Sequence, residues 1–261
     1  MQKDKDRGMG DKRIRSGTSQ GSRRAEWGLH HHGIGQHKIY VHGAQKHQLR
    51  PSPALRDVGG KKGIKGREEY LADRALNDGK INHITQLIHP AFYNALAAAK
   101  LRVKERSAEG EIWASQWTSQ YLNQAIFENR QTALHRDSNG APYCADFLYL
   151  LGEFKGGDLF LPDLNLRIEW LPNCALMFDG RIFAHEVLPW EGERRLCLVN
   201  YIWKTSLDDL EVELPEEAPQ LAGILQRVRD QRADRASNAK EPKFANAESQ
   251  NGKQSVGGTM V

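Results

Sequence analysis

Hydrophobic residues recur at nearly helical spacing in the part of the chain before Gly110. Apolar positions between 84 and 101 lie mostly three to five residues apart, which predicts helix. Pro90 falls inside this stretch and is expected to divide it into a turn and a long second helix. Upstream, EEYLADRAL at 68–76 predicts a short helix that ends at the Asn-Asp-Gly sequence behind it. This part of the chain is therefore predicted to be helical.

Beyond Gly110 the hydrophobic positions gather in short runs of strand length. The runs are separated by Gly-Gly, Pro-Asp, Pro-Asn and Asp-Gly pairs, which are typical of turns. The expected strands cover 144–151, 158–162, 166–171, 174–178 and 195–203. Several short strands after a helical segment favour an α+β fold, a jelly-roll or barrel with supporting helices packed on one side. A last helix is predicted at about residues 217–232.

Charge is distributed unevenly along the 261 residues. Residues 1–66 hold 15 Lys or Arg and 5 Asp or Glu, a charge of +10. Because the whole chain has a net charge of +4, residues 67–261 have a charge of −6. A basic segment on an acidic body favours a polyanionic partner, with nucleic acid first. The alternative is a solvated segment that binds nothing specific.

Four segments are expected from these patterns. Residues 1–26 form a disordered basic tail, because they contain almost nothing apolar. Residues 27–66 form a basic arm rich in His and Gly, with a short strand at IYVH and a glycine loop at GGKKGIKG whose lysines are placed to contact phosphates. Residues 67–234 form the folded domain, with its strands within about 120–205, and residues 235–261 form a second disordered tail.

The cysteines and the absence of long apolar runs bear on where the protein acts. Cys144, Cys174 and Cys197 are far apart and form no CxxC pair, as expected for core thiols in a reducing compartment. No apolar run approaches the roughly 20 residues that span a bilayer. The charged N-terminus lacks the apolar stretch of a secretory signal. The protein is therefore expected inside the cell without a membrane partner, and its oligomeric state is left open.

Three features that carry chemistry follow one another along the chain: His135-Arg136-Asp137, then His185, then Arg195. Residues i and i+2 of an extended segment point the same way, so His135 and Asp137 can reach one metal ion. His185 follows a predicted strand and a turn, where the mouth of a barrel would present it. Two histidines and one carboxylate form the facial set that binds non-haem Fe(II) and leaves open positions for a 2-oxo acid and O2.

Arg195 begins a predicted strand and shares a face with Cys197, Val199 and Tyr201. If that face lines the barrel, its guanidinium lies in an apolar cavity and needs an anion. The forked donors of arginine suit a carboxylate, such as the distal carboxylate of 2-oxoglutarate. A register shift of one residue would exchange it with Arg194, which remains the second candidate.

Each of these residues also has a purely structural interpretation. His135 would then be a surface residue, Asp137 the start of a Ser-Asn-Gly turn, and His185 a hydrogen-bonded core histidine. A further alternative is a Zn(II) site built from the histidines of the arm, although no cysteine accompanies them and their spacing matches no known pattern. These histidines are His30, His32, His37, His42 and His47.

Three stretches resemble a known enzyme family: HRDSNG, LGEFKGGDLFLPDLNLRIEWLPNCALMF and AHEVLPWEGERRLCLVNY. Together they are similar to the double-stranded β-helix core, a jelly-roll or cupin-like fold, of the 2-oxoglutarate/Fe(II) dioxygenases. Within that superfamily they are most similar to the TET/JBP-like group, particularly its compact fungal 2OGFeDO members. The resemblance covers roughly residues 120–205. It implies Fe(II) and 2-oxoglutarate as cofactors, O2 as co-substrate and stimulation by ascorbate.

The resemblance also implies roles for individual residues. His135, Asp137 and His185 would be the catalytic iron ligands, and Arg195 would anchor 2-oxoglutarate. Asn139 matches an Asn that follows the His-x-Asp motif and would position cofactor or substrate.

Other positions match the family in structure or depart from it. Gly156 and Gly157 match a tight turn before a Leu-x-Leu strand. Cys197 stands where a hydroxyl residue often helps to bind the cofactor carboxylate, which makes it a further cofactor-binding candidate. Pro172-Asn173 stands where Pro-Gly-Asp is more usual. These departures weaken the assignment to one substrate class.

In TET/JBP-like enzymes the oxidised carbon is the methyl group of 5-methylcytosine or thymine in DNA, with the base flipped out of the duplex. The resemblance therefore implies a nuclear enzyme that binds DNA and acts in DNA demethylation, and the basic arm fits that partner. Candidates for a residue that stacks on the base, or else for the core, are Trp113, Trp117, Tyr121 and Tyr143. Two other functions stay open: the same chemistry on a protein or small molecule, and a non-catalytic metal-binding barrel module.

Overall fold

The computed structural model describes residues 14–16, 28–41, 44–49, 51–56 and 60–214, with single positions 223, 226, 229, 230 and 233. The chain divides into two compact units, Met1–Glu217 and Ala218–Val261. In the second unit every described residue is helical, and Gln226 donates a hydrogen bond to Asp230 one turn later. Of the predicted tails, only residues 14–16 are described; the rest of 1–26 and all of 235–261 lie outside the described residues.

The helices of the first unit mostly precede its main strands. They are α1 (Pro53–Arg56), α2 (Gly60–Ile88), α3 (Pro90–Arg106) and α4 (Ala108–Gln116), and α5 (Lys204–Asp209) follows the last strand. Pro90 separates α2 from α3 as expected, because it lacks the N–H that a continuing helix requires. His89 caps α3, with its Nδ1 accepting a hydrogen bond from the backbone N–H of Phe92 at 3.4 Å. Among the described residues, no helix is long and apolar enough to cross a membrane.

Helix α2 is longer than the sequence predicts. The predicted loop at GGKKGIKG and the predicted helix end at Asn-Asp-Gly are both wrong, because α2 continues unbroken through residues 60–66 and 77–79. Asp78 forms an ion pair with Arg74 one turn earlier, with Nε 2.9 Å from Oδ2, and also accepts a hydrogen bond from the Thr118 hydroxyl. These contacts override the local turn signal of the sequence.

The strands of the first unit pair antiparallel throughout the described residues. The larger sheet has the order β10-β7-β12-β5-β2, and a smaller sheet has the order β11-β8-β9. The larger sheet consists of β2 (Gly28–Gly33), β5 (Asn123–Glu128), β7 (Asp146–Gly156), β10 (Ala175–Phe178) and β12 (Trp190–Tyr201). The smaller consists of β8 (Leu159–Leu161), β9 (Leu166–Ile168) and β11 (Glu186–Val187). Two further pairs are β1 (Ile14–Ser16) with β6 (Arg130–Thr132), and β3 (Gln36–Val41) with β4 (Ala44–Leu49).

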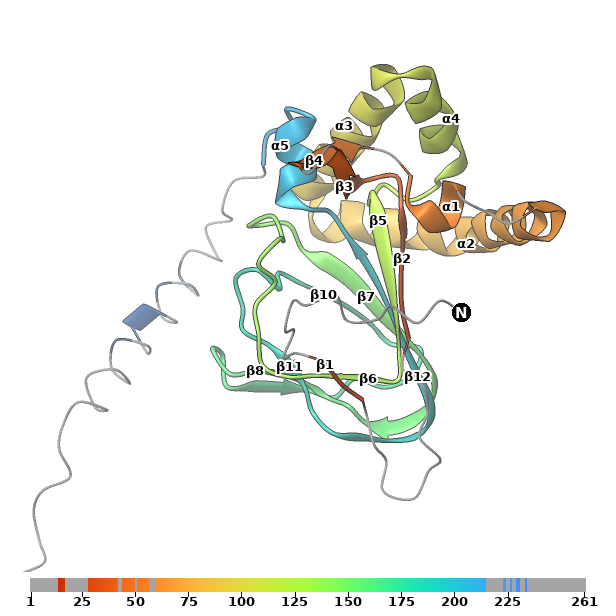
Figure 1. Cartoon of the computed structure of the whole chain (residues 1–261). Coiled ribbons are helices and arrows are strands. Elements are labelled where there is room, and N and C mark those ends of the chain that lie inside the picture. The colour runs from red at the N-terminus through yellow and green to blue at the C-terminus, as the bar shows by residue number, and fades with distance from the viewer. Residues whose placement is uncertain are drawn as a thin grey trace, which may run out of the picture. The chain divides into compact units, whose positions relative to one another are not determined.

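The predicted fold class is confirmed: helices gather on one side of a double-stranded β-helix (Figure 1). One hydrophobic cluster joins α2, α3 and α4 to the larger sheet, and a second lies between the two sheets. Successive side chains of β12 point to opposite faces of the larger sheet. Cys197 and Val199 face the second cluster, whereas Asn200 points toward the helices. Asn200 accepts a hydrogen bond from Gln124, whose carbonyl accepts one from Tyr70 of α2. The larger sheet therefore holds the helices on one face and leaves the other face for the cavity.

The predicted basic arm is part of this fold where it is described. Strand β2 lies at the edge of the larger sheet and pairs with β5 along its whole length. Strand β1, within the predicted N-terminal tail, pairs with β6. The boundary expected at residue 67 therefore does not separate the arm from the sheet.

Candidate metal centre and cofactor cavity

Backbone hydrogen bonds bring two histidines side by side from segments 50 residues apart. His135, just after β6, and His185, just before β11, form an isolated antiparallel bridge, with N···O distances of 3.0 and 2.9 Å. The backbone N–H of Asp137 donates to the carbonyl of Gly180 at 2.9 Å. The two segments are thus held together by main-chain contacts that do not depend on the side chains.

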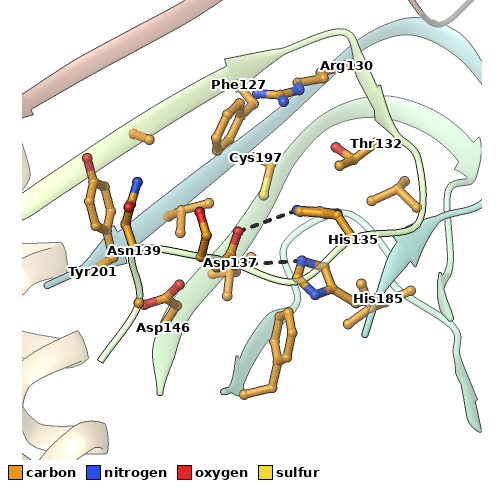
Figure 2. Close-up of a pocket in the computed structure, with 18 of the residues that line it drawn as sticks. Phe127, Arg130, Thr132, His135, Asp137, Asn139, Asp146, His185, Cys197 and Tyr201 are labelled. Atoms are coloured by element: carbon orange, nitrogen blue, oxygen red, sulfur yellow. Dashed lines mark ion pairs between the residues drawn. The ribbon is translucent and has the colours of Figure 1, made fainter. Parts of the chain in front are cut away.

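The side chains of this bridge converge on one point. The Nε2 atom of His135 lies 3.4 Å from Oδ1 of Asp137, and the Nε2 atom of His185 lies 3.8 Å from Oδ2 (Figure 2). One ligand atom from each of the three residues lies within 4.8 Å of the others. In the described part of the chain, no other group of three such residues has this geometry. Nitrogen, nitrogen and carboxylate oxygen are the donors that suit non-haem iron.

The other ring nitrogens are placed to hold the imidazoles in the required form. Nδ1 of His135 lies 2.9 Å from the carbonyl of Ala133, and Nδ1 of His185 lies 3.1 Å from that of Phe183. A proton on Nδ1 satisfies these carbonyls and leaves the Nε2 lone pair for a metal ion. Burial, with the nearby His135, lowers the pKa of His185, which favours the neutral ligand form.

A turn after β10 shapes the space around Asp137. Asp179 accepts hydrogen bonds from the backbone N–H groups of Tyr143, Arg181 and Ile182. Burial raises the pKa of Asp179 to about 6, and these three hydrogen bonds oppose the shift. A Cβ on Gly180 would lie 2.3 Å from Oδ2 of Asp137, so only glycine leaves room for the carboxylate there.

A cavity of about 370 Å³ extends from the triad between the sheets, and Arg195 lies in its wall. Arg195 is 2% exposed, and its guanidinium carbon lies 5.4 Å from the ring centres of both Phe154 and Trp170. Nη2 donates a long hydrogen bond of 3.5 Å to the Gly157 carbonyl, and Nε has no partner within the described residues. Burial lowers the pKa of Arg195, the expected penalty for a cation in apolar surroundings. The site therefore fits a carboxylate, which would satisfy both the charge and the free donor.

The other predicted cofactor residues take different places. Cys197 lines the cavity, and burial raises the pKa of its thiol to about 11, so it is neutral. Asn139 is exposed and lies at the edge of the cavity. Arg194, the second candidate for the anchor, points outward, with 60% of its side chain exposed and its Nε 2.9 Å from Glu128. The assignment to Arg194 is wrong in this register, because successive residues of β12 face opposite sides of the sheet.

The predicted stacking candidates do not line the cavity. Trp113, Trp117 and Tyr121 are buried in the cluster between helices and sheet, and Tyr143 lies outside the cavity wall. The interpretation of three of them as core is therefore confirmed.

The aromatic and polar residues that do line the cavity are missed by the sequence argument. They include Phe127, Arg130, Asp146, Phe178 and Trp203, with His31 from the basic arm. Arg130 is buried against the Phe127 ring at 4.7 Å. Nδ1 of His31 lies 3.0 Å from the hydroxyl of Tyr201. Tyr201 lines the cavity, on the face of its strand that the sequence predicted. The alternation of β7, in which a lone Asp opens an apolar run, is a signal that could have singled out Asp146.

Fold and site together define a class of enzyme, the 2-oxoglutarate- and Fe(II)-dependent oxygenases. The Tet_JBP family model, described as the oxygenase domain of the 2OGFeDO superfamily, matches residues 67–204, and the chain belongs to this family. The predicted enzyme class and its cofactors, Fe(II) and 2-oxoglutarate, are thereby confirmed. No curated protein matches the chain.

Two solved structures are among those to which the chain is similar. "NgTET1 in complex with 5mC DNA" is 17% identical, with a TM-score of 0.45, over 70% of this chain and 63% of that one. The viral collagen prolyl hydroxylase vCPH from Paramecium Bursaria Chlorella virus-1, in its 2OG complex, is 14% identical, with a TM-score of 0.26, over 31% and 57%. The chain thus spans less than two thirds of either protein.

Proposed function

We propose that this oxygenase oxidises the methyl group of 5-methylcytosine, or of thymine, in DNA. The observation that carries the proposal is the different character of two parts of the cavity. Figure 2 shows Arg130 and Cys197 above the triad, whereas Asn139, Asp146 and Tyr201 lie to the left of Asp137. Aromatic and hydrogen-bonding groups together are what a flipped base needs, since it is stacked on one surface and read at its polar edge.

The residues of the triad take the role of iron ligands in this proposal. His135, Asp137 and His185 hold Fe(II), and Arg195 takes the distal carboxylate of 2-oxoglutarate. When bound, this pair supplies with O2 the oxidant that inserts oxygen into a C–H bond. The Phe178 ring packs edge-on against His185, with centroids 4.9 Å apart, and keeps that imidazole in place. Cys197 contributes a neutral thiol to the cavity wall near Arg195, without adding a second charge.

Exposed cations beside the cavity and on α2 also suit a phosphate backbone. Arg181 is exposed, although its guanidinium donates to the carbonyl of Ser138 beside the cavity. Lys61, Lys62 and Lys65 are exposed on the first two turns of α2. These cations and the +10 balance of residues 1–66 favour DNA over a small anionic substrate.

The test is succinate release from 2-oxoglutarate, with Fe(II) and ascorbate, in the presence of duplexes carrying 5-methylcytosine, thymine or unmodified cytosine. We expect 5-methylcytosine duplexes to stimulate turnover and to yield oxidised cytosines in mass spectra of the digested DNA. His135→Ala and Asp137→Ala should abolish both signals while the protein stays folded by circular dichroism.

The outcomes separate the candidate functions. Succinate release that no duplex stimulates would retain the oxygenase and reject DNA, which leaves a protein or small-molecule substrate. An iron-loaded, folded protein that releases no succinate would leave a metal-binding module without turnover.

A further inference from the structure

Asp146 places a carboxyl group in the cavity wall. It is the first residue of β7, and its backbone pairs with Phe178 of β10, so the position is fixed by the larger sheet. Asp146 and Leu148 both line the cavity, whereas Phe147 between them is buried toward the helices. Strand alternation therefore aims the Asp146 side chain at the cavity rather than at bulk water.

Within the part of the chain that the structure describes, this carboxyl group has no partner. Among the described residues, no side chain or backbone N–H donates a hydrogen bond to it, and no cation pairs with it. Other buried acids of the same unit are satisfied: Asp78 pairs with Arg74, and Asp179 accepts backbone N–H groups. The carboxyl is half-buried and faces the cavity, so its hydrogen-bonding capacity is left for what enters the cavity.

The surroundings of Asp146 indicate what it could bind. Figure 2 shows it on the same side of Asp137 as Asn139 and Tyr201, away from the two imidazoles. A flat aromatic ligand in this part of the cavity would meet a tyrosine ring and a carboxyl acceptor. In either protonation state a carboxyl keeps at least one acceptor oxygen.

We propose that Asp146 reads the exocyclic amino group of the cytosine ring and so selects 5-methylcytosine over thymine. This rests on the function proposed above and names its base. Carboxylates recognise cytosine by accepting a hydrogen bond from its N4 amino group. Thymine presents a carbonyl oxygen at that position, which would face the carboxyl oxygen without a hydrogen bond.

The experiment compares kcat/KM on two duplexes, one with 5-methylcytosine and one with 5-methyl-2-pyrimidinone, which lacks only the amino group. The wild type should prefer 5-methylcytosine by about 10- to 100-fold, the cost of leaving a buried polar group unpaired. In Asp146→Leu, kcat/KM on 5-methylcytosine should fall by a similar factor and the preference should shrink to about one. Asp146→Asn keeps an acceptor oxygen of the same shape and should retain most of the preference.

Several outcomes decide the matter. If Asp146→Leu keeps the preference of the wild type for 5-methylcytosine over the analogue, the assignment is overturned. If the leucine variant does not fold, Asp146→Ala is used in its place. A wild type that oxidises both bases equally overturns the assignment whatever the variants do. If the wild type releases succinate but oxidises no base, the proposed function itself is overturned. An equal rate on the two duplexes would overturn only the role of Asp146.

Discussion

Gly180 is the glycine near the metal centre with the least room for a side chain. An added Cβ would lie 2.3 Å from Oδ2 of Asp137 and 3.2 Å from Cε1 of His185, so the carboxylate would have to move. We expect Gly180→Ala to weaken Fe(II) affinity by about 10- to 100-fold, the usual effect of disturbing groups that orient metal ligands. Anaerobic titration with Fe(II) measures it.

Gly79→Ala is the matched control, because a Cβ there meets nothing within 4 Å. It lies inside α2, where alanine is expected to stabilise the protein by about 0.4–1 kcal/mol. Fe(II) affinity equal to that of the wild type in both alanine variants would contradict the crowding argument.

Replacement of Arg195 should affect stability and cofactor binding in opposite directions. Arg195→Met removes a buried cation whose Nε has no partner in the described chain, so the protein without 2-oxoglutarate should be no less stable. The KM for 2-oxoglutarate should rise at least about 30-fold, because loss of a buried charge partner costs about 2 kcal/mol or more. Thermal melting and 2-oxoglutarate titration measure the two effects.

Arg194→Met makes the same change on the exposed face of β12. Its pair with Glu128 is solvent-exposed on the arginine side and contributes little. The KM for 2-oxoglutarate should therefore stay within about twofold of wild type. A larger effect at Arg194 than at Arg195 would show that the anchor has been assigned to the wrong arginine.

At the residue scale, the sequence predicts the direction of a side chain where spacing along an extended segment decides it. His135 and Asp137 share a side because they are two apart in an extended segment, and Arg195 faces inward by the alternation of β12. It does not predict which aromatic residues reach the cavity. Trp117 is nearer in sequence to the motif than Trp203, but the fold buries Trp117 under the helices and brings Trp203 to the cavity.

At the scale of elements, the Arg74–Asp78 pair decides the course of α2. Arg74 is 6% and Asp78 1% exposed, Nη2 donates to Oδ1 at 3.1 Å, and the guanidinium carbon lies 3.5 Å over the Trp117 ring. We expect Asp78→Ala to lower the free energy of unfolding by about 3–5 kcal/mol, because it leaves a buried charge uncompensated. Urea denaturation measures the change.

The double variant Arg74→Met/Asp78→Leu removes both charges and should recover a large part of that loss. Glu69→Ala breaks an exposed pair with Lys65 at the same i,i+4 spacing on the same helix. It should cost about 0.5 kcal/mol or less. Equal losses in Glu69→Ala and Asp78→Ala would mean that burial does not set the strength of this pair.

The elements themselves were predictable to different degrees. Strands such as β10 and β12 follow from apolar runs bounded by turns, and Pro90 marks the junction of α2 and α3. The extent of α2 was not predictable, because Asn-Asp-Gly is a turn signal unless Asp78 finds a buried cation and Thr118 arrives from 40 residues away. Tertiary contacts of that kind leave no local trace in sequence.

At the scale of the whole first unit, stability and function reside in different layers. The cluster between helices and sheet borders a pocket of about 30 Å³, whereas the cluster between the sheets surrounds the cavity of about 370 Å³. In that cavity, Nε of Arg195 has no partner among the described residues. Ligands should therefore stabilise the second layer most.

This separation predicts how cofactors change stability. Under anaerobic conditions, Fe(II) with 2-oxoglutarate at about 100 times its Kd should stabilise the protein by about 2.7 kcal/mol, or about 5–10 °C in Tm. Asp137→Ala should show little of this shift. Hydrogen exchange should slow around His135 and His185, which ligands hold together, and change little in α3, which has no contact with the cavity. Equal protection of α3 would indicate that the layers unfold as one unit and would contradict the division.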